Sequence, residues 1–187
     1  KRPTTLSFLG PNQAEAGSLA LLKAKLLDND NEPVEGKEIR FQVGEENFSA
    51  STGSDGIAFA PMTLLQSIGS KTLRMVFDGD NAFEAASSDE ESFAVVDTTP
   101  PITSFEFNAT EVNGRFVSAV RLSLNASDNF GGSGVATTQF SLNNATWSNY
   151  SQQLSFSSGS RTVFFKSTDN TGNVEETKSI SIAINAP

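Results

Sequence analysis

The chain contains neither Cys nor His, and these two absences exclude several kinds of site. Without Cys, no disulfide and no thiolate metal site can form. Without His, the commonest general base and a frequent metal ligand near neutral pH are missing. Stability must therefore come from packing or from bound ions. Because no spaced nucleophile–base pair is visible either, we expect a non-catalytic protein.

Positive charge and long apolar runs are also scarce. The chain has 13 Lys and Arg against 22 Asp and Glu, and its net charge of −9 should repel nucleic acid. No run of about 18 apolar residues indicates a membrane span. No signal peptide is visible, and Lys1 is not a natural start. We therefore expect a mature segment or a piece of a longer protein.

Short stretches in which apolar and polar residues alternate make up most of the chain. Residues 37–43 place Ile39, Phe41 and Val43 on one face, and residues 161–167 alternate in the same way. Turns rich in Gly, Asp and Asn separate these stretches at a spacing near ten residues, which is typical of small sandwich domains. The pattern predicts an all-β protein built from antiparallel β-sandwiches.

Residues 18–27 admit a second interpretation. Their Ala, Leu and Lys residues favour a helix. However, the apolar residues recur at every second position, and Gly17 and the turn at 28–31 bracket the segment tightly. We therefore predict a strand.

The segment Asp97-Thr98-Thr99-Pro100-Pro101 divides the chain. Each Pro restricts the residue before it to extended backbone, so the pair indicates a short, stiff connector. The parts on either side are each close to the size of one small sandwich domain, about 100 residues. We predict two tandem domains, 1–96 and 97–187, with 97–101 as the linker.

Turn and core residues of the first half follow a known pattern. They are Gly17 with Leu22-Lys23-Ala24, the run from Pro33 to Phe41, Asp55-Gly56-Ile57-Ala58, and Phe77-Asp78-Gly79-Asp80. This half resembles a bacterial Ig-like repeat of the kind that builds the stalks of invasin- and intimin-like adhesins. The resemblance covers most of residues 4–96 and implies an Ig-like sandwich.

The second half carries a different set of marks over nearly all of 97–185. They are the segment 97–101, Ser127-Asp128-Asn129, Gly132-Ser133-Gly134-Val135, Phe140-Ser141-Leu142, Trp147 with Tyr150, and the run from Ser167 to Glu175. This half resembles another Ig-like repeat of secreted and cell-surface proteins. In that family such repeats occur in arrays or are appended to carbohydrate-active enzymes.

Acidic loop residues form two groups of candidate calcium ligands. In an Ig-like sandwich, the loops after the second and sixth strands lie at one pole, where the first strand also starts. The group expected at the pole of the second domain that faces the first is Asp97, Asp128 and Asp169, and the group at the far pole of the first domain is Asp28, Asp30, Asp78 and Asp80. Calcium prefers several such oxygens; the alternative is ordinary turns capped by backbone amides.

Two further sets of residues are candidate modification or ligand sites. Asn-x-Ser/Thr sequons begin at Asn47, Asn108, Asn125, Asn144 and Asn149, and they can be glycosylated only where the host has the machinery. Trp147 and Tyr150 could stack against a sugar, although aromatic residues of small sandwiches usually pack in the core or at an edge.

These features favour a non-catalytic stalk or spacer in a larger extracellular or cell-surface protein. The expected partners are neighbouring Ig-like repeats of the same parent protein; neither nucleic acid nor membrane insertion is expected. One alternative is an adhesive module that binds a glycan or a surface protein, including an accessory module of a secreted enzyme. Another is a filament subunit that donates a strand to the open edge of its neighbour.

Overall fold

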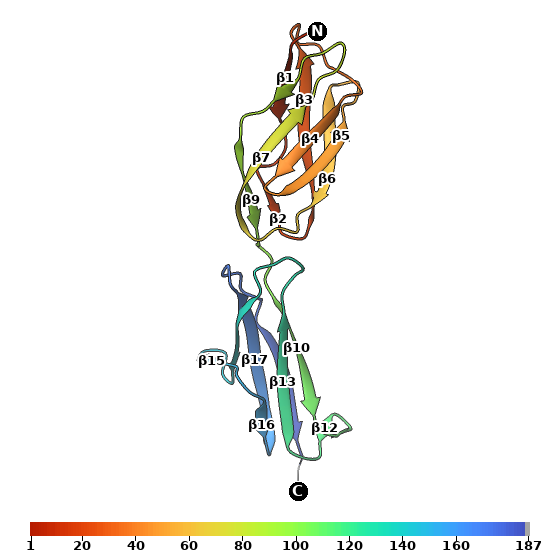
Figure 1. Cartoon of the computed structure of the whole chain (residues 1–187). Coiled ribbons are helices and arrows are strands. Elements are labelled where there is room, and N and C mark those ends of the chain that lie inside the picture. The colour runs from red at the N-terminus through yellow and green to blue at the C-terminus, as the bar shows by residue number, and fades with distance from the viewer. Residues whose placement is uncertain (186–187) are drawn as a thin grey trace. The chain divides into compact units, whose positions relative to one another are not determined.

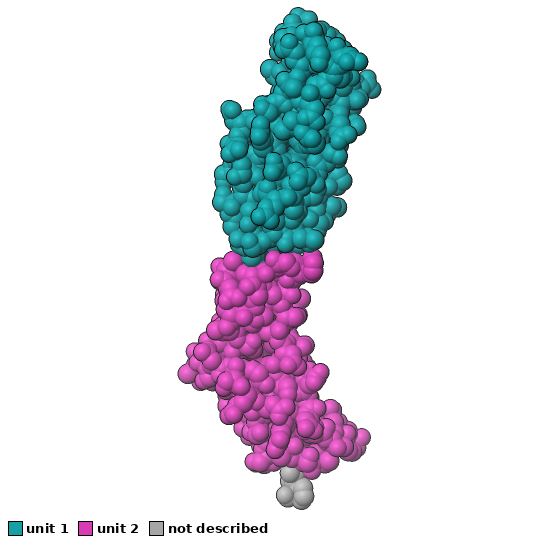
Figure 2. Space-filling view, in the orientation of Figure 1, with its two compact units in different colours: residues 1–97 teal, residues 98–187 magenta. Residues whose placement is uncertain are grey.

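The computed structural model describes residues 1–185, and every regular element in that range is a β-strand. The predicted all-β class is therefore confirmed. The chain divides into two compact units, Lys1–Asp97 and Thr98–Pro187 (Figure 2). Each unit is a sandwich of two sheets with its own hydrophobic core.

Unit 1 pairs a small sheet with a larger one (Figure 1). The small sheet has the order β1 (Thr4–Phe8), β3 (Leu19–Asp28), β6 (Ile57–Thr63). The larger sheet has the order β2 (Gln13–Glu15), β9 (Glu91–Val96), β7 (Gly69–Phe77), β4 (Glu38–Val43), β5 (Glu46–Ser51), and β8 (Ala86–Ser87) pairs beside β7. The first segment of the chain thus contributes β1 to one sheet and β2 to the other.

The period-two pattern of the sequence gives unit 1 its core. Ile39, Phe41 and Val43 of β4 are fully buried, whereas Arg40 between them is exposed. Residues 19–28 form a strand and not a helix, since Leu22, Ala24 and Leu26 point into the core. The predicted inner faces of both segments are confirmed.

Unit 2 has the same two-sheet plan. One sheet has the order β10 (Ile102–Asn108), β13 (Val120–Ser127), β16 (Leu154–Phe156). The other has the order β11 (Glu111–Val112), β12 (Arg115–Phe116), β18 (Lys178–Ile184), β17 (Gly159–Asp169), β14 (Val135–Ser141), β15 (Ser148–Asn149). Val163 and Phe165 of β17 are buried in its core, as their alternation predicts.

Several short strands have no counterpart in the sequence prediction. β2 pairs parallel to β9 over only three residues, 13–15, and β12 pairs parallel to β18 at one position, Phe116 with Ile184. Segments this short contain too few residues to show a period of two. They are recognised only once the partner strand is in place.

Because each unit closes its own core, the two units should fold separately. Fragments 1–97 and 98–187 are each expected to give a single cooperative thermal transition and the circular dichroism of a β protein. Differential scanning calorimetry of both fragments, beside the full chain, checks this expectation. If neither fragment folds alone, the chain is a single folding unit, which contradicts the prediction.

Candidate functional site: the loop carboxylates

Three carboxylates named by the sequence are close together. One carboxylate oxygen from each of Asp97, Asp128 and Asp169 lies within 4.8 Å of the other two. Asp97 and Asp169 are buried, and Asp128 is half-buried. Within residues 1–185 this is the single group of three or more acidic residues with such spacing. Carboxylates this close repel one another unless a cation or hydrogen-bond donors offset their charge, so this acidic cluster could bind an ion.

The Asp169 carboxylate also organises the turn that follows β17. Its Oδ1 accepts hydrogen bonds from the backbone N–H groups of Thr171 (3.0 Å) and Asn173 (2.8 Å), and its Oδ2 accepts one from Asn173 Nδ2 (2.7 Å). Burial raises the pKa of Asp169, but the hydrogen bonds from Asn173 and Thr171 outweigh it and leave the pKa below its ordinary value of 3.8. Asp169 is therefore a carboxylate at neutral pH.

Asp128 plays a similar part in the loop after β13. Its Oδ2 accepts from the Gly134 N–H (2.6 Å) and its Oδ1 from the Asn129 N–H (3.0 Å). A Cβ atom at Gly132 would lie 2.7 Å from Asp128 Oδ2 and 2.5 Å from Asn129 Oδ1, so glycine is needed for this close approach. Asn129 Oδ1 is buried, and no hydrogen-bond donor reaches it within the described chain. A buried carbonyl oxygen without a donor, next to a carboxylate, suits a cation.

The four aspartates predicted at the far pole of unit 1 are arranged differently. Asp28 accepts from Arg2 Nη1 (2.6 Å), and the Asp30 N–H donates to its Oδ1 (3.0 Å). Asp78 pairs with Arg40 (2.7 Å). The described residues contain no trio of mutually close carboxylates here; three of these aspartates instead face a cation of unit 1.

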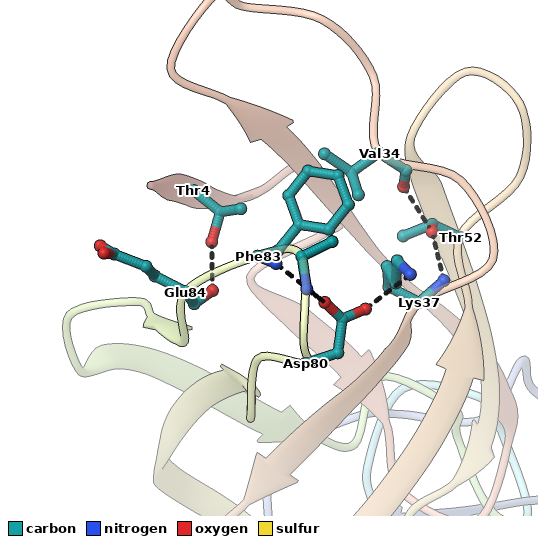
Figure 3. Close-up of polar contacts among 8 residues, drawn as sticks. Thr4, Val34, Lys37, Thr52, Asp80, Phe83 and Glu84 are labelled. Carbon is teal, nitrogen blue, oxygen red and sulfur yellow. Dashed lines mark hydrogen bonds and ion pairs between the residues drawn. The ribbon is translucent and has the colours of Figure 1, made fainter. Parts of the chain in front are cut away.

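Asp80 shows this pairing of an aspartate with a cation most clearly (Figure 3). Its Oδ2 accepts from Lys37 Nζ (2.7 Å), and its Oδ1 accepts from the N–H groups of Ala82 and Phe83 (both 2.8 Å). The Lys37 ammonium and these two amides lower the pKa of Asp80 to about 2. Asp80 thus closes a turn and orders the loop between β7 and β8.

One buried polar network was not predicted from the sequence. Glu175 accepts hydrogen bonds from the N–H (2.7 Å) and hydroxyl (2.6 Å) of Thr103, and it pairs with Lys178 (2.5 Å). The Thr103 hydroxyl also meets Ser167 Oγ (2.6 Å), and Lys178 Nζ donates to the Thr103 carbonyl (2.9 Å). Thr103 lies 72 residues from Glu175, so no local motif could reveal the pair.

The candidate aromatic site is largely occupied by the protein itself. The Tyr150 hydroxyl accepts from the Leu124 N–H (3.1 Å), and its ring packs against the core of unit 2. The Trp147 ring is half-buried, with Lys166 Nζ 4.6 Å from its centroid. A sugar would have to displace Lys166 to stack on that face of Trp147.

The sequon residues are all accessible. The side chains of Asn47, Asn108, Asn125, Asn144 and Asn149 are exposed. Exposure is what an attached glycan requires; their modification stays a prediction.

The chain is similar to several solved structures, all at low sequence identity. No protein-family model and no curated protein matches it. Among solved structures, it is similar to the fibronectin(III)-like modules of Clostridium thermocellum CbhA, with 14% identity, a TM-score of 0.38, and 97% of this chain and 94% of that chain covered.

Two adhesins are also similar in fold. One is a 1.5-MDa bacterial ice-binding adhesin (12% identity, TM-score 0.44, 100% of this chain covered). The other is a Ca²⁺-stabilized adhesin with which an Antarctic bacterium binds ice (12% identity, TM-score 0.41, 98% covered). The chain spans 66% and 49% of the lengths of these two adhesin chains.

Proposed function

We propose that the chain is a non-catalytic pair of Ig-like modules that acts as a spacer in a larger extracellular or cell-surface protein, unit 1 being a repeat of the invasin and intimin type. The observation that carries the proposal is the tandem of two complete sandwiches, each with its own core, joined through the short segment Asp97–Pro101. Two prolines stiffen that segment. The neighbours of these modules would be further repeats of the same parent protein.

The buried polar side chains support a structural role. Thr52 donates to the Val34 carbonyl (2.6 Å), and Thr138 and Ser167 share a hydrogen bond between hydroxyls (2.8 Å). Asp28 and Glu175 are bound by Arg2 and by Lys178. These groups hold strands and turns together, so they are not poised for reaction with a substrate. No helix in the described range is long and apolar enough to cross a membrane.

The spacer proposal is tested by display on a cell surface. The full chain, or unit 2 alone, is placed between a membrane anchor and a dye-labelled tag, and energy transfer to a membrane dye is measured. Adding unit 1 should lower the transfer. The same chain applied to a glycan array should bind nothing. Saturable binding to a defined glycan would contradict the spacer proposal and indicate an adhesive module.

We propose further that the ion of the acidic cluster is calcium. Asp97, Asp128 and Asp169 supply carboxylate oxygens, and Asn129 Oδ1 supplies a buried carbonyl oxygen beside Asp128. These are hard oxygen ligands, and the absence of Cys and His from the chain leaves no thiolate or imidazole donor.

Calcium should raise the melting temperature of the wild-type chain relative to chelator. By mass action, free calcium at 100 times its dissociation constant would add about 2.7 kcal/mol. Asp128→Asn should abolish most of this gain, whereas Asp89→Asn, an exposed aspartate outside the cluster, should keep it. Calorimetric titration and melting curves in calcium and in chelator measure both effects. If calcium leaves the wild-type melting curve unchanged, or stabilises all three proteins equally, these carboxylates are ordinary turn residues.

A further inference from the structure

Strand β18 of unit 2 has an open edge. Along one side it pairs with β17, from Gly159 opposite Ile184 to Phe165 opposite Lys178. Along its other side, the sole ladder partner in the part of the chain that the structure describes is β12, which meets β18 at Ile184. Residues 178–182 therefore form an edge with no ladder partner in the described chain.

The backbone groups that face this edge can be identified. The Asn185 N–H donates to the Phe116 carbonyl across it (2.8 Å). Because N–H and C=O directions alternate along a strand, Ser179, Ser181 and Ala183 direct their backbone groups to the same side as Asn185. Ser179 and Ser181 are both exposed. These two serines thus offer free donors and acceptors to an incoming strand.

Beyond Lys178 at its start, the edge carries none of the usual protection. Natural edge strands are blunted by charges, proline or bulges. The run from Ser179 to Ile184 has no charged residue, no Pro and no Gly, and it alternates Ser or Ala with Ile. Short uncharged segments of high β-propensity are the kind that pair with copies of themselves. In unit 1, by contrast, β2 covers the last three residues of β9.

An apolar surface lies next to the same edge. A depression between β10 and β18 is lined by Phe105, Phe165, Lys178 and Ser179. Phe105 is 39% exposed although its ring packs edge-on against Phe165. A strand beside β18 has apolar surface to cover as well as backbone groups to bind.

We propose that β18 pairs edge to edge, antiparallel, with β18 of a second copy of this chain. With Ile180 opposite the partner's Ile180, Ser179 lies opposite the partner's Ser181, and each such pair closes a ring of two backbone hydrogen bonds. This register keeps every Ile on the core side of the joined sheet. It also sets the two Lys178 side chains at opposite ends, away from each other.

Net charge controls the strength of this pairing. Each copy carries −9, so two copies repel. Between about 0.1 M and about 1 M NaCl the Debye length falls from ~10 Å to ~3 Å, and the repulsion is screened. Association is therefore expected to strengthen with salt and with protein concentration.

Sedimentation equilibrium of the full chain tests the proposal. The wild-type mass should rise from 19.9 kDa toward twice that value as concentration and salt increase. Ser181→Pro removes an N–H that faces the edge without removing a bond to β17, and should weaken association at least about tenfold. Ser181→Ala keeps the N–H and should associate like the wild type.

Hydrogen exchange gives a second measurement that does not depend on the Pro variant folding. In wild-type protein, the Ser179 and Ser181 amides should exchange more slowly as concentration rises, whereas the Ile182 amide is protected at all concentrations. A chain that stays monomeric at high salt overturns the proposal, as does equal association of the Pro and Ala variants. A monomer that binds a synthetic Ser-Ile repeat peptide would assign the edge to a foreign strand and would likewise overturn pairing between copies.

Discussion

Replacing Phe41 by Ala is expected to lower the free energy of unfolding of unit 1 by about 3–5 kcal/mol. Phe41 is fully buried in the middle of β4, with Ile39 and Val43 buried on either side. Truncation removes most of an aromatic side chain and leaves a cavity that its neighbours can fill only in part. Phe165→Ala should cost unit 2 about as much, because Phe165 of β17 is 1% exposed in the core of that unit.

The chain offers an internal probe for this experiment. Its one Trp, Trp147, lies in unit 2, so Trp fluorescence follows the unfolding of unit 2 in the intact chain. Phe165→Ala should move the denaturant transition that fluorescence records to lower concentration. Phe41→Ala should leave the fluorescence transition in place and move only the part of the circular-dichroism transition that comes from unit 1. Arg40→Ala, an exposed neighbour in the same strand, should cost under about 1 kcal/mol. Equal losses for Phe41→Ala and Arg40→Ala would mean that β4 presents both faces to the core.

Replacing Glu175 by Ala is expected to cost unit 2 about 2–4 kcal/mol, because it orphans the buried Thr103 N–H and removes charge-assisted hydrogen bonds. The Glu175 side chain is 6% exposed, whereas its partner Lys178 is 41% exposed and can return to water. Most of the lost stability therefore comes from the Thr103 N–H, which is left buried without an acceptor. Glu176→Ala, an exposed carboxylate one residue away, is the matched control and should change stability little.

The stabilities of Glu175→Ala and Glu176→Ala should also depend differently on pH in the acid range. Burial raises the pKa of Glu175, but hydrogen bonds from Lys178 and Thr103 outweigh it and hold the pKa below its ordinary value of 4.5. The unfolded chain thus binds this proton at higher pH than the folded chain. The stabilisation is complete above pH 4.5 and is lost as the pH falls through the folded-state pKa. Fluorescence-monitored unfolding at several pH values should give Glu175→Ala a flatter acid dependence than Glu176→Ala; equal slopes would contradict this role.

Local patterns of the sequence predict most of the fold, because burial on one face of a strand leaves a signal of period two. Phe41 and Val163 lie where that alternation puts them. β5 is less evident, since its small and polar residues in 46–51 give weak contrast between its faces. The parallel contact of β2 with β9 depends on residues about 80 positions apart, and no local pattern carries that information.

Part of the candidate site could likewise be predicted from the sequence, and part could not. Reasoning from sandwich topology named Asp97, Asp128 and Asp169 as neighbours, and the structure brings them within 4.8 Å. Topology could not reveal that Arg2 and Lys37 would face Asp28 and Asp80, since those pairs depend on side-chain reach between distant segments. Nor could it show that Asn129 Oδ1 is left without a donor, which depends on the detailed path of the 128–134 loop.

The parallel pairing of β2 with β9 determines how unit 1 would bear tension. β2 lies near the start of the unit and β9 ends it, so pulling its two ends apart loads the hydrogen bonds between Gln13–Glu15 and 94–96 in shear. Bonds in shear must break together, whereas bonds that are unzipped break one after another. In unit 2, the parallel contact of β12 with β18 is confined to Phe116 with Ile184 and Asn185. Under a common load, unit 2 should therefore yield first and unit 1 should persist as the stronger mechanical element.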